Sequence, residues 1–309
     1  MMGKKEKKLK LITHDGSFHA DDIFAYATLS LLLEKKREKF EVIRTRDKET
    51  IHDADYVFDV GGIYDAKLNR FDHHQTDGAG EREGIPYSSF GLVWKKFGVE
   101  VAGNKEVADF IEHKLAMPID ANDNGIDLYK NNFPNISAYT LQDVFAIFSP
   151  TSLEDMEKDK QFLKAFAWGK EILQREIKKA NDQIEVAQII KGFYKKAKDK
   201  RLIVIDEPKV SKFEIWDALQ NFTEPLFAVF GDNEKWSAVA MRKTKNSFGN
   251  RKDLPASWAG LMDKKLQELT GVQDAVFCHR ALFLAVAKSK EGAIKLSQLA
   301  LDYKLTPSA

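Results

Sequence analysis

The stretch that decides the fold reads LKLITHDGSFHADDIFAYATLSLLLEKK and covers residues 9–36. It opens with a short apolar run, which predicts a buried strand that ends near His14. Apolar side chains then recur at helical spacing over 20–38, and Asp21 and Asp22 occupy the first turn, where the helix dipole favours negative charge. A strand that leads directly into a helix is the repeating unit of parallel sheets.

The same alternation of strand and helix continues through the first half of the chain. Further strands are expected at 40–45, 56–60 and 68–72, and helices at 88–97, 105–116 and 140–148. We therefore predict an α/β fold in which helices flank a mostly parallel sheet.

A long helical stretch separates this part from a second pattern. Residues 153–198 consist mainly of helix formers, with charges throughout and no proline, so we expect one or two long helices there. After them, short apolar runs predict strands, accompanied by helices at 257–269 and 291–301. We expect two domains: a larger one over 1–197 that includes the helical connector, and a smaller α/β domain over 198–309.

Composition and charge exclude several classes of protein. Of the 309 residues 43% are apolar and 31% charged, as in soluble globular proteins, and the net charge of +1 lacks the basic excess of a duplex binder. Cys278 is the only cysteine, which excludes an internal disulfide and favours a reducing, cytoplasmic setting. The longest apolar run, ALFLAVA at 281–287, is too short to cross a bilayer. The basic start, MMGKKEKKLK, lacks a following apolar stretch, so we expect a solvated tail rather than a secretory signal.

Histidines and aspartates gather in four short motifs, each at the carboxyl end of a predicted strand or helix. These are HDGSFHADD at 14–22, DVGG at 59–62, DHHQ at 72–75 and DANDNG at 120–125. In open parallel sheets, ligands bind at this edge. Each motif alone has an ordinary explanation as a helix start, a turn or a loop. Four of the seven histidines fall in two of the motifs, however, and this joint pattern predicts one common site.

Several imidazoles and carboxylates together suit a pair of divalent cations. In two-metal sites the ions lie roughly 3.5–4 Å apart, and a water between them loses a proton near neutral pH. The resulting hydroxide attacks phosphorus while the cations neutralise charge on the phosphate oxygens. Mixed nitrogen and oxygen ligands favour Mn²⁺, with Mg²⁺ as a substitute. We therefore expect a metal-dependent phosphoesterase with two divalent cations.

The four motifs, in this order, resemble those of the DHH phosphoesterase superfamily, which includes RecJ-type single-strand exonucleases and manganese-dependent pyrophosphatases. The chain is most similar to the melanocyte proliferating gene 1 exonuclease family, whose opening TH.G.FH.D is matched from Thr13 to Asp21. The likeness extends to NRKDLPASWAGLMDKKLQELTGV at 250–272, VFCHRALF at 276–283 and KEGAIKLSQLAL at 290–301. It therefore covers nearly the whole chain.

The resemblance implies a role for each matching position. One metal would be held by His14, His19 and Asp59, and the other by Asp21, Asp59, His73 and Asp120. Asp59 would therefore bridge the two ions. His74 would contact the substrate phosphate or assist the leaving oxygen, and Asp72 would orient the neighbouring imidazoles. Asp22 and Asp123 stay open, either as ligands or as partners of the ligands.

In this superfamily a smaller second domain closes over the metals and holds the substrate. The resemblance therefore makes substrate-binding candidates of four basic side chains in the last third: Arg242, Arg251, His279 and Arg280. Arginine suits phosphate because its planar fork can donate two hydrogen bonds at once. The alternative interpretation is that residues 242–252 form a solvated basic loop.

These observations lead us to expect an exonuclease that hydrolyses phosphodiester bonds of single-stranded RNA or short oligonucleotides. Two alternatives stay open: a hydrolase of a small phosphoanhydride or mononucleotide, such as pyrophosphate, and a metal-binding protein without turnover. The sequence also leaves open whether the substrate is RNA or DNA, in which direction it is cleaved and which metal is physiological. The oligomeric state is open as well, and a homodimer is one possibility.

Overall fold

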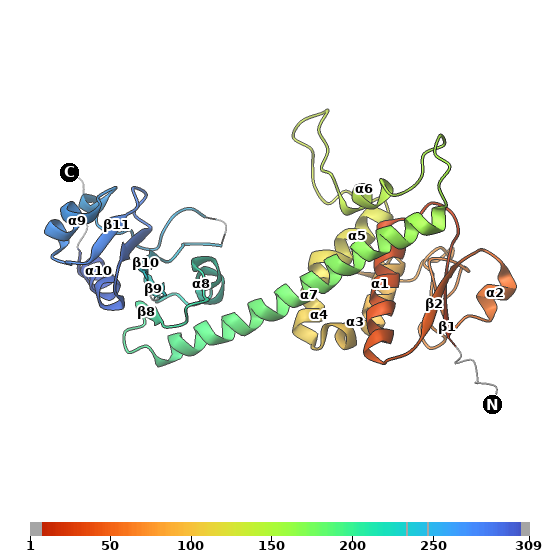
Figure 1. Cartoon of the computed structure of the whole chain (residues 1–309), viewed down its shortest axis with the longest axis horizontal. Coiled ribbons are helices and arrows are strands. Elements are labelled where there is room, and N and C mark those ends of the chain that lie inside the picture. The colour runs from red at the N-terminus through yellow and green to blue at the C-terminus, as the bar shows by residue number, and fades with distance from the viewer. Residues whose placement is uncertain (1–7, 233, 246, 304–309) are drawn as a thin grey trace. The chain divides into compact units, whose positions relative to one another are not determined.

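The computed structural model describes residues 8–232, 234–245 and 247–303, which form two compact units (Figure 1). The first unit ends at Asn181 and the second begins at Asp182, so the division falls inside helix α7 (Lys158–Lys196). The domain limits expected from the sequence, near residue 197, stay a prediction, because one continuous helix belongs to both units. Among the described residues, no helix is both long and apolar enough to cross a membrane.

The first unit contains a five-stranded sheet in the order β2-β1-β3-β5-β4. Its strands are β1 (Leu9–Thr13), β2 (Phe40–Arg44), β3 (Tyr56–Phe58), β4 (Tyr64–Asp65) and β5 (Arg70–Phe71). Strand β1 pairs in parallel with β2 and β3, β3 pairs in parallel with β5, and only β4 is antiparallel to its neighbour. This confirms the mostly parallel sheet, and it places the carboxyl ends of four strands at one edge.

Helices and one small hairpin complete the first unit. They are α1 (Ala20–Lys35), α2 (Lys48–His52), the hairpin strands β6 (Glu81–Arg82) and β7 (Ile85–Pro86), α3 (Ser89–Ala102), α4 (Lys105–Ile111), the π-helical turn η1 (Glu112–Ala116), α5 (Met117–Asp123) and α6 (Leu141–Ala146).

The helix expected at 105–116 continues for another seven residues, because α4, η1 and α5 follow one another without a break. Pro118 lacks the N–H that a helix interior needs, and the wider π turn that precedes it lets the helix pass the proline. Asp120 and Asp123 therefore lie on a helix, whereas the sequence had placed them in a loop after one. Their side chains are consequently held on fixed faces of α5.

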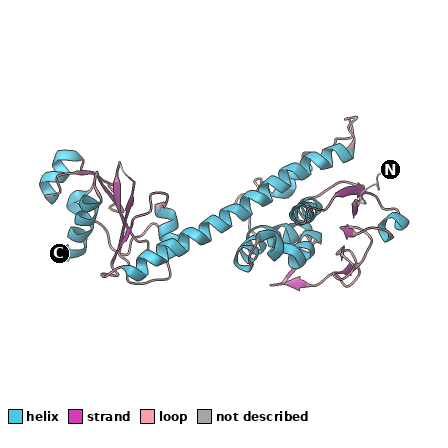
Figure 2. Ribbon diagram, turned by 60° about the horizontal axis from the view of Figure 1, so that its bottom comes forward, coloured by secondary structure: helices cyan, strands magenta, loops and turns pink. Residues whose placement is uncertain are grey.

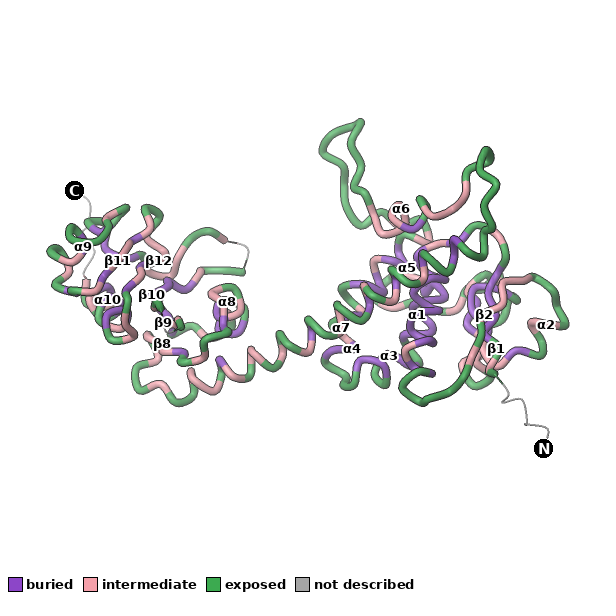
Figure 3. The backbone as a smooth tube through the Cα atoms, in the orientation of Figure 1, coloured by how far each residue is buried: buried purple, intermediate pink, exposed green. Residues whose placement is uncertain are grey.

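Helix α1 is the centre of the first unit and is buried along most of its length (Figure 3). The ring of Phe24 packs against Phe90 of α3 and Phe145 of α6, with centroid distances of 5.3 and 5.6 Å. A helix that is apolar on every side belongs in a core. Helix α7 approaches closely at Gly169, where a Cβ atom would lie 2.5 Å from a methyl group of Ile23. This packing holds the amino end of α1 in a rigid position.

The second unit contains a mixed five-stranded sheet in the order β11-β12-β10-β9-β8 (Figure 2). Its elements are β8 (Leu202–Ile205), α8 (Lys212–Leu219), β9 (Phe227–Gly231), β10 (Trp236–Ala240), the 3-10 turn η2 (Ala256–Trp258), α9 (Asp263–Thr270), β11 (Ala275–Cys278), β12 (Leu284–Ala287) and α10 (Lys290–Asp302). Only β8 and β9 pair in parallel. The smaller α/β part expected after the long helix is confirmed.

Each face of this second sheet is covered by helices. Helix α10 packs its Leu296 into a cluster with Phe227, and α8 packs its Ile215 into another with Ile203. Helix α8 was not expected from the sequence, although its start carries the signal Ser-x-x-Glu: Ser211 Oγ and the Glu214 carboxylate cap each other's backbone amides.

Candidate metal centre

The ends of three neighbouring parallel strands bring the predicted residues together. His14 follows β1, Asp59 follows β3, and the Asp72-His73-His74 motif follows β5. The amino end of α1 adds His19 and Asp21, and the carboxyl end of α5 adds Asp123. Together with Ser17, Arg46 and Asn124, most of these side chains line a cleft of about 820 Å³.

Asp59 lies at the middle of the cluster. Its Oδ2 atom is 3.1 Å from His14 Nε2, and its Oδ1 atom is 3.5 Å from His73 Nε2. Burial would raise the pKa of this carboxyl, but contacts with the two imidazoles hold it below its ordinary value. The backbone of Asp59 is left-handed, with a φ of 54°, and Gly61 and Gly62 follow with positive φ as well. Such a conformation is strained in a non-glycine residue, and strain of this kind is often found at functional sites.

Asp21 is buried without any partner that satisfies it. Neither of its carboxylate oxygens has a hydrogen-bond partner among the described residues. Burial raises the pKa of Asp21 well above its ordinary value, and the charges of Asp59, Asp123 and Asp22 raise it further. A buried carboxylate without a partner is costly in free energy, and a bound cation would offset that cost.

Asp22 joins the helix start to His14. Its Oδ1 atom accepts a hydrogen bond of 3.1 Å from the His19 backbone N–H, and its Oδ2 atom lies 3.2 Å from His14 Nε2. Burial would lower the pKa of His14, but Asp22 and Asp59 outweigh it and raise that pKa to about 9. Asp22 thus supports an imidazole of the cluster.

Ligand atoms approach one another in three overlapping groups, within 4.8 Å in each group. The groups are His14 with His19 and Asp59, Asp59 with His73 and His74, and His19 with Asp21 and Asp123. Asp59 and His19 each belong to two groups, so two cations held here would share ligands. Of the ligands expected from the sequence, the structure brings together His14, His19, Asp21, Asp59 and His73.

Asp120 is absent from all three groups, and its expected role as a ligand stays a prediction. Its Oδ1 atom accepts hydrogen bonds from Ser88 Oγ (2.5 Å) and Gly91 N (3.1 Å), and its Oδ2 atom accepts one from Arg82 Nη1 (2.7 Å). Burial nevertheless raises the pKa of Asp120 to about 6. Asp123 faces the cleft instead, with Oδ2 at 3.2 Å from His73 Nε2.

Asp72 holds His74 at the mouth of the cleft. The buried Asp72 Oδ1 atom is 2.7 Å from His74 Nδ1 and also accepts the His74 backbone N–H at 3.2 Å. Its Oδ2 atom accepts a hydrogen bond from Gly62 N. The His74 side chain is 63% exposed, so its other ring nitrogen is free to meet a substrate.

Arg46 is a cleft residue that the sequence reasoning missed. It lies just beyond β2, whose carboxyl end is beside that of β1 in the sheet, and its exposed Nε atom is 3.3 Å from Asp15. A cation at the end of a parallel strand reaches the same edge as the acids, but Arg46 belongs to none of the four motifs that indicated the site. A guanidinium in this cleft can contact a phosphate.

The four basic side chains proposed to bind substrate lie in the second unit and differ in how many of their hydrogen-bond donors already have partners. The guanidinium of Arg251 donates to the backbone carbonyls of Gln220, Phe222, Pro225 and Arg242, so it joins loops of its own unit. Arg242 stacks on the ring of Trp216, with 3.9 Å to the centroid. His279 Nδ1 accepts a hydrogen bond from Ala281 N, and Arg280 is exposed. Arg242 and Arg280 keep donors that a substrate could use.

Fold and site together define an α/β protein with a candidate metal centre at the carboxyl edge of a parallel sheet. A family model, MYG1_exonuc, described as an uncharacterised protein family (UPF0160), matches residues 10–301. The chain therefore belongs to the MYG1 exonuclease family, which confirms the resemblance seen in its motifs.

Similar proteins are found in distant organisms. The MYG1 protein of Caenorhabditis elegans is 32% identical over 94% of this chain and 94% of its own length. The human MYG1 exonuclease is 26% identical over 94% of this chain and 85% of its own length. The crystal structure of exonuclease RecJ bound to manganese covers 97% of this chain and 91% of its own, at 11% identity and a TM-score of 0.29. Family membership follows from the sequence matches alone, since so low a TM-score supports no inference.

Proposed function

We propose that this protein is a divalent-metal-dependent phosphodiesterase, an exonuclease that acts on single-stranded RNA or short oligonucleotides. The observation that carries the proposal is the convergence of imidazoles and carboxylates from three strand ends and two helix ends on Asp59. The human and mouse relatives are both named MYG1 exonuclease, which supports this reaction class.

The donor atoms fit divalent cations. Both oxygens of Asp21 and the Nδ1 atom of His14 are buried without a hydrogen-bond partner in the described structure. His73 Nε2 lies 3.2 Å from Asp123 Oδ2 but forms no hydrogen bond with it. Two ligands of the same ion are expected to lie this close without bonding to each other. The residues that would hold two cations are His14, His19, Asp21, Asp59, His73 and Asp123. This mixture of nitrogen and oxygen donors favours Mn²⁺, with Mg²⁺ as a substitute.

The cations, when bound, supply Lewis-acid stabilisation of the phosphate oxygens and acidify the water that attacks phosphorus. The protein supplies the rest of the chemistry. His74, oriented by Asp72, is placed to donate a proton to the leaving oxygen or a hydrogen bond to the phosphate. Arg46 lies on the wall of the same cleft, where it can neutralise phosphate charge.

A nucleic-acid substrate is supported by the surface of the second unit. Phe213 and Phe248 are exposed, and the guanidinium of Arg242 lies 5.4 Å from the Phe248 ring centroid. Exposed rings beside cations suit unpaired bases, because stacking recognises any base. Trp216 is buried and donates its indole N–H to Ala240 O, so it supports Arg242 and is not itself a stacking platform.

A reducing, cytoplasmic setting remains part of the proposal. Cys278 is fully buried in the second unit, and burial raises the pKa of its thiol to about 12. A thiol in this state behaves as a small apolar core residue.

The deciding experiment is a substrate panel with Mn²⁺ and Mg²⁺ in parallel. It contains single-stranded RNA, single-stranded DNA, dinucleotides and pyrophosphate, and it is run with the native protein and a variant carrying Asp59→Ala and His73→Ala. We expect release of nucleoside monophosphates by the native protein alone. Equal release by the double variant would refute the proposal. Hydrolysis of pyrophosphate only would favour a phosphoanhydride hydrolase, and Mn²⁺ uptake without hydrolysis would favour a metal-binding protein.

A further inference from the structure

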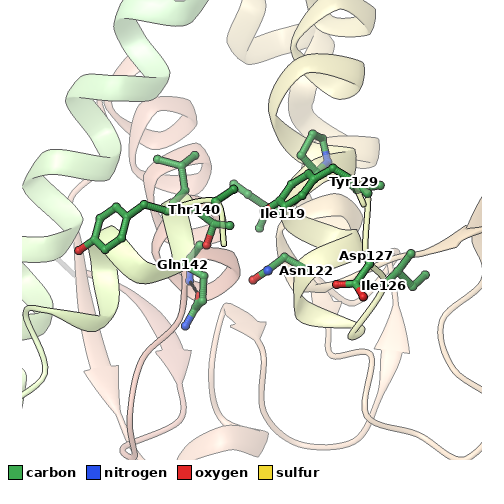
Figure 4. A pocket seen from close by; sticks show the side chains of 13 residues that line it. Ile119, Asn122, Ile126, Asp127, Tyr129, Thr140 and Gln142 are labelled. Carbon is green, nitrogen blue, oxygen red and sulfur yellow. Dashed lines mark hydrogen bonds between the residues drawn. The ribbon is translucent and has the colours of Figure 1, made fainter. Parts of the chain in front are cut away.

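A second cavity, of about 270 Å³, lies between α5 and α6 in the first unit. Figure 4 shows Asn122 of α5 on one side of it and Thr140 and Gln142, at the start of α6, on the other. The segment that connects the two helices completes the wall with the rings of Tyr129 and Tyr139. Nothing in the proposed hydrolysis uses this cavity.

The cavity and the metal cleft are next to each other along two stretches of backbone. Ala20 lines the cavity and its neighbour His19 lines the cleft; likewise Asn122 lines the cavity and Asp123 the cleft. Neighbouring Cα atoms are only about 3.8 Å apart. The Ala20 N–H also donates to Gln142 Oε1 at 2.8 Å, which ties α6 to the end of α1 that carries His19. The cavity and the metal cleft are therefore lined by neighbouring residues at the same two helix ends.

The lining combines flat apolar walls with a few polar groups. Its apolar side chains are Pro118, Ile119, Ile126, Leu128 and Leu141. The two tyrosine side chains are largely open, with Tyr129 at 51% and Tyr139 at 70% exposure, and neither ring makes a ring contact with another aromatic side chain in the described structure. Its polar groups are the amides of Asn122 and Gln142, the Asp127 carboxylate and the Thr140 hydroxyl. The Gln142 oxygen already accepts the Ala20 N–H, and its amide nitrogen remains a donor. A planar molecule with an apolar face and a polar edge matches this lining.

We propose that this cavity binds the nucleobase of the nucleotide whose phosphate is held at the metal centre. The proposal rests on the proposed function, because it assigns the base of the same substrate. The tyrosine rings stack on the base, and the amides of Asn122 and Gln142 meet its edge. Stacking accepts every base, so the cavity distinguishes nucleotides from other phosphate compounds rather than one base from another.

The test is equilibrium binding of nucleoside 5′-monophosphates and of ribose 5-phosphate, which lacks the base, to the full chain with Mn²⁺. Neither ligand contains a phosphodiester, so the proposed reaction does not consume either ligand during the measurement. The variants are the pair Tyr129→Ala with Tyr139→Ala, which removes the stacking rings, and Ala138→Trp, which fills the cavity from an exposed position. Phe133→Ala is the matched control, because Phe133 is an exposed ring of the same segment that does not line the cavity.

We expect the native protein and Phe133→Ala to bind each nucleotide roughly tenfold or more tightly than ribose 5-phosphate. The tyrosine pair and Ala138→Trp should remove most of this preference and leave the affinity for ribose 5-phosphate unchanged. Equal affinity of the native protein for both ligands, or a preference that survives both changes, would overturn the proposal. These binding results need no hydrolysis, so they are independent of the substrate panel. A protein that prefers nucleotides but hydrolyses no member of the panel would refute the proposed function and leave the base-binding cavity supported.

Discussion

Asp120 and Asp123 lie three residues apart on α5, yet their carboxylates have different partners. Asp120 is paired with Arg82 and bonded to Ser88 and Gly91, whereas Asp123 approaches His73 in the cleft. Asp120 therefore ties α5 to the β6–β7 hairpin and to α3, and this tie sets the position of Asp123. We therefore expect Asp120 to support the fold and Asp123 to bind metal.

Substituting Asp120 and Asp123 in separate variants should distinguish a role in stability from a role in metal binding. Asp123→Asn should weaken Mn²⁺ binding at least roughly tenfold with little change in the free energy of unfolding. Asp120→Ala should lower the free energy of unfolding by about 3 kcal/mol, because it leaves the largely buried Arg82 with Glu112 as its one ionic partner among the described residues. Calorimetric Mn²⁺ titration and chemical denaturation measure the two effects. Tight Mn²⁺ binding by Asp123→Asn would return Asp120 to consideration as a ligand.

Because Asp120 packs directly against α3 at Gly91, a larger side chain at position 91 should not be tolerated. A Cβ atom at this position would collide with the Asp120 carboxylate, so Gly91→Ala should cost about 1–3 kcal/mol of stability. Gly192→Ala on α7 is the control: nothing lies within 4 Å of its Cβ position, and alanine there should stabilise the helix by about 0.5–1 kcal/mol. Denaturation curves of the two variants should shift in opposite directions. A stable Gly91→Ala variant would mean that Asp120 is not packed as described.

Metal binding should release protons. The pKa of about 9 means that His14 carries a proton at neutral pH in the metal-free protein, and an imidazole must lose it to bind a metal. Because the pKa is raised, loss of this one proton should increase Mn²⁺ affinity about tenfold per pH unit up to about pH 9. His73, whose pKa is also raised, should add to the slope. Calorimetry in buffers of different ionisation enthalpy measures the released protons directly. His14→Ala should bind Mn²⁺ more weakly and release fewer protons on binding, and a pH-independent affinity in the native protein would contradict the prediction.

Asp72 should matter for turnover more than for metal binding. Asp72→Asn keeps the size of the side chain but removes the charge that holds His74 Nδ1 at 2.7 Å. We expect kcat to fall about 10–100-fold and its pH profile to change, with Mn²⁺ affinity nearly unaffected. His74→Ala should produce a similar loss, and adding Asp72→Asn to it should have little further effect. Additive losses would show that Asp72 does not act through His74.

Arg242 and Arg251 should respond differently to substitution. Arg251→Ala removes a guanidinium that donates to four backbone carbonyls, and each hydrogen bond from a charged group is worth about 1.5–3 kcal/mol. It should therefore destabilise the second unit, as thermal unfolding would show. Arg242→Ala should leave stability nearly unchanged and weaken binding of single-stranded RNA, which fluorescence anisotropy measures. The opposite pattern, a stable Arg251→Ala variant with weak RNA binding, would restore Arg251 as a substrate contact.

Much of the site was readable because parallel strands place consecutive chain segments at the same edge. His14 and Asp59 each follow a recognisable strand, so the sequence alone could bring them together. Arg46 reaches that edge in the same way, but a single arginine beside no motif gave no reason to select it. Helix α8 was not predicted because it is only eight residues long, and the capping residue Ser211 was the only clear indication of a helix start.

The sequence by itself determined the mostly parallel α/β fold, the family and most of the candidate metal ligands, because strand and helix periodicity and the four motifs are local properties of the chain. Only the tertiary structure decided which partners Asp120 and Asp123 have, and which partners Arg242 and Arg251 have. In each pair the residue types are identical, and the role depends on which distant groups the packed backbone places beside the side chain. Those partners are fixed by helix and loop packing, which no local pattern encodes.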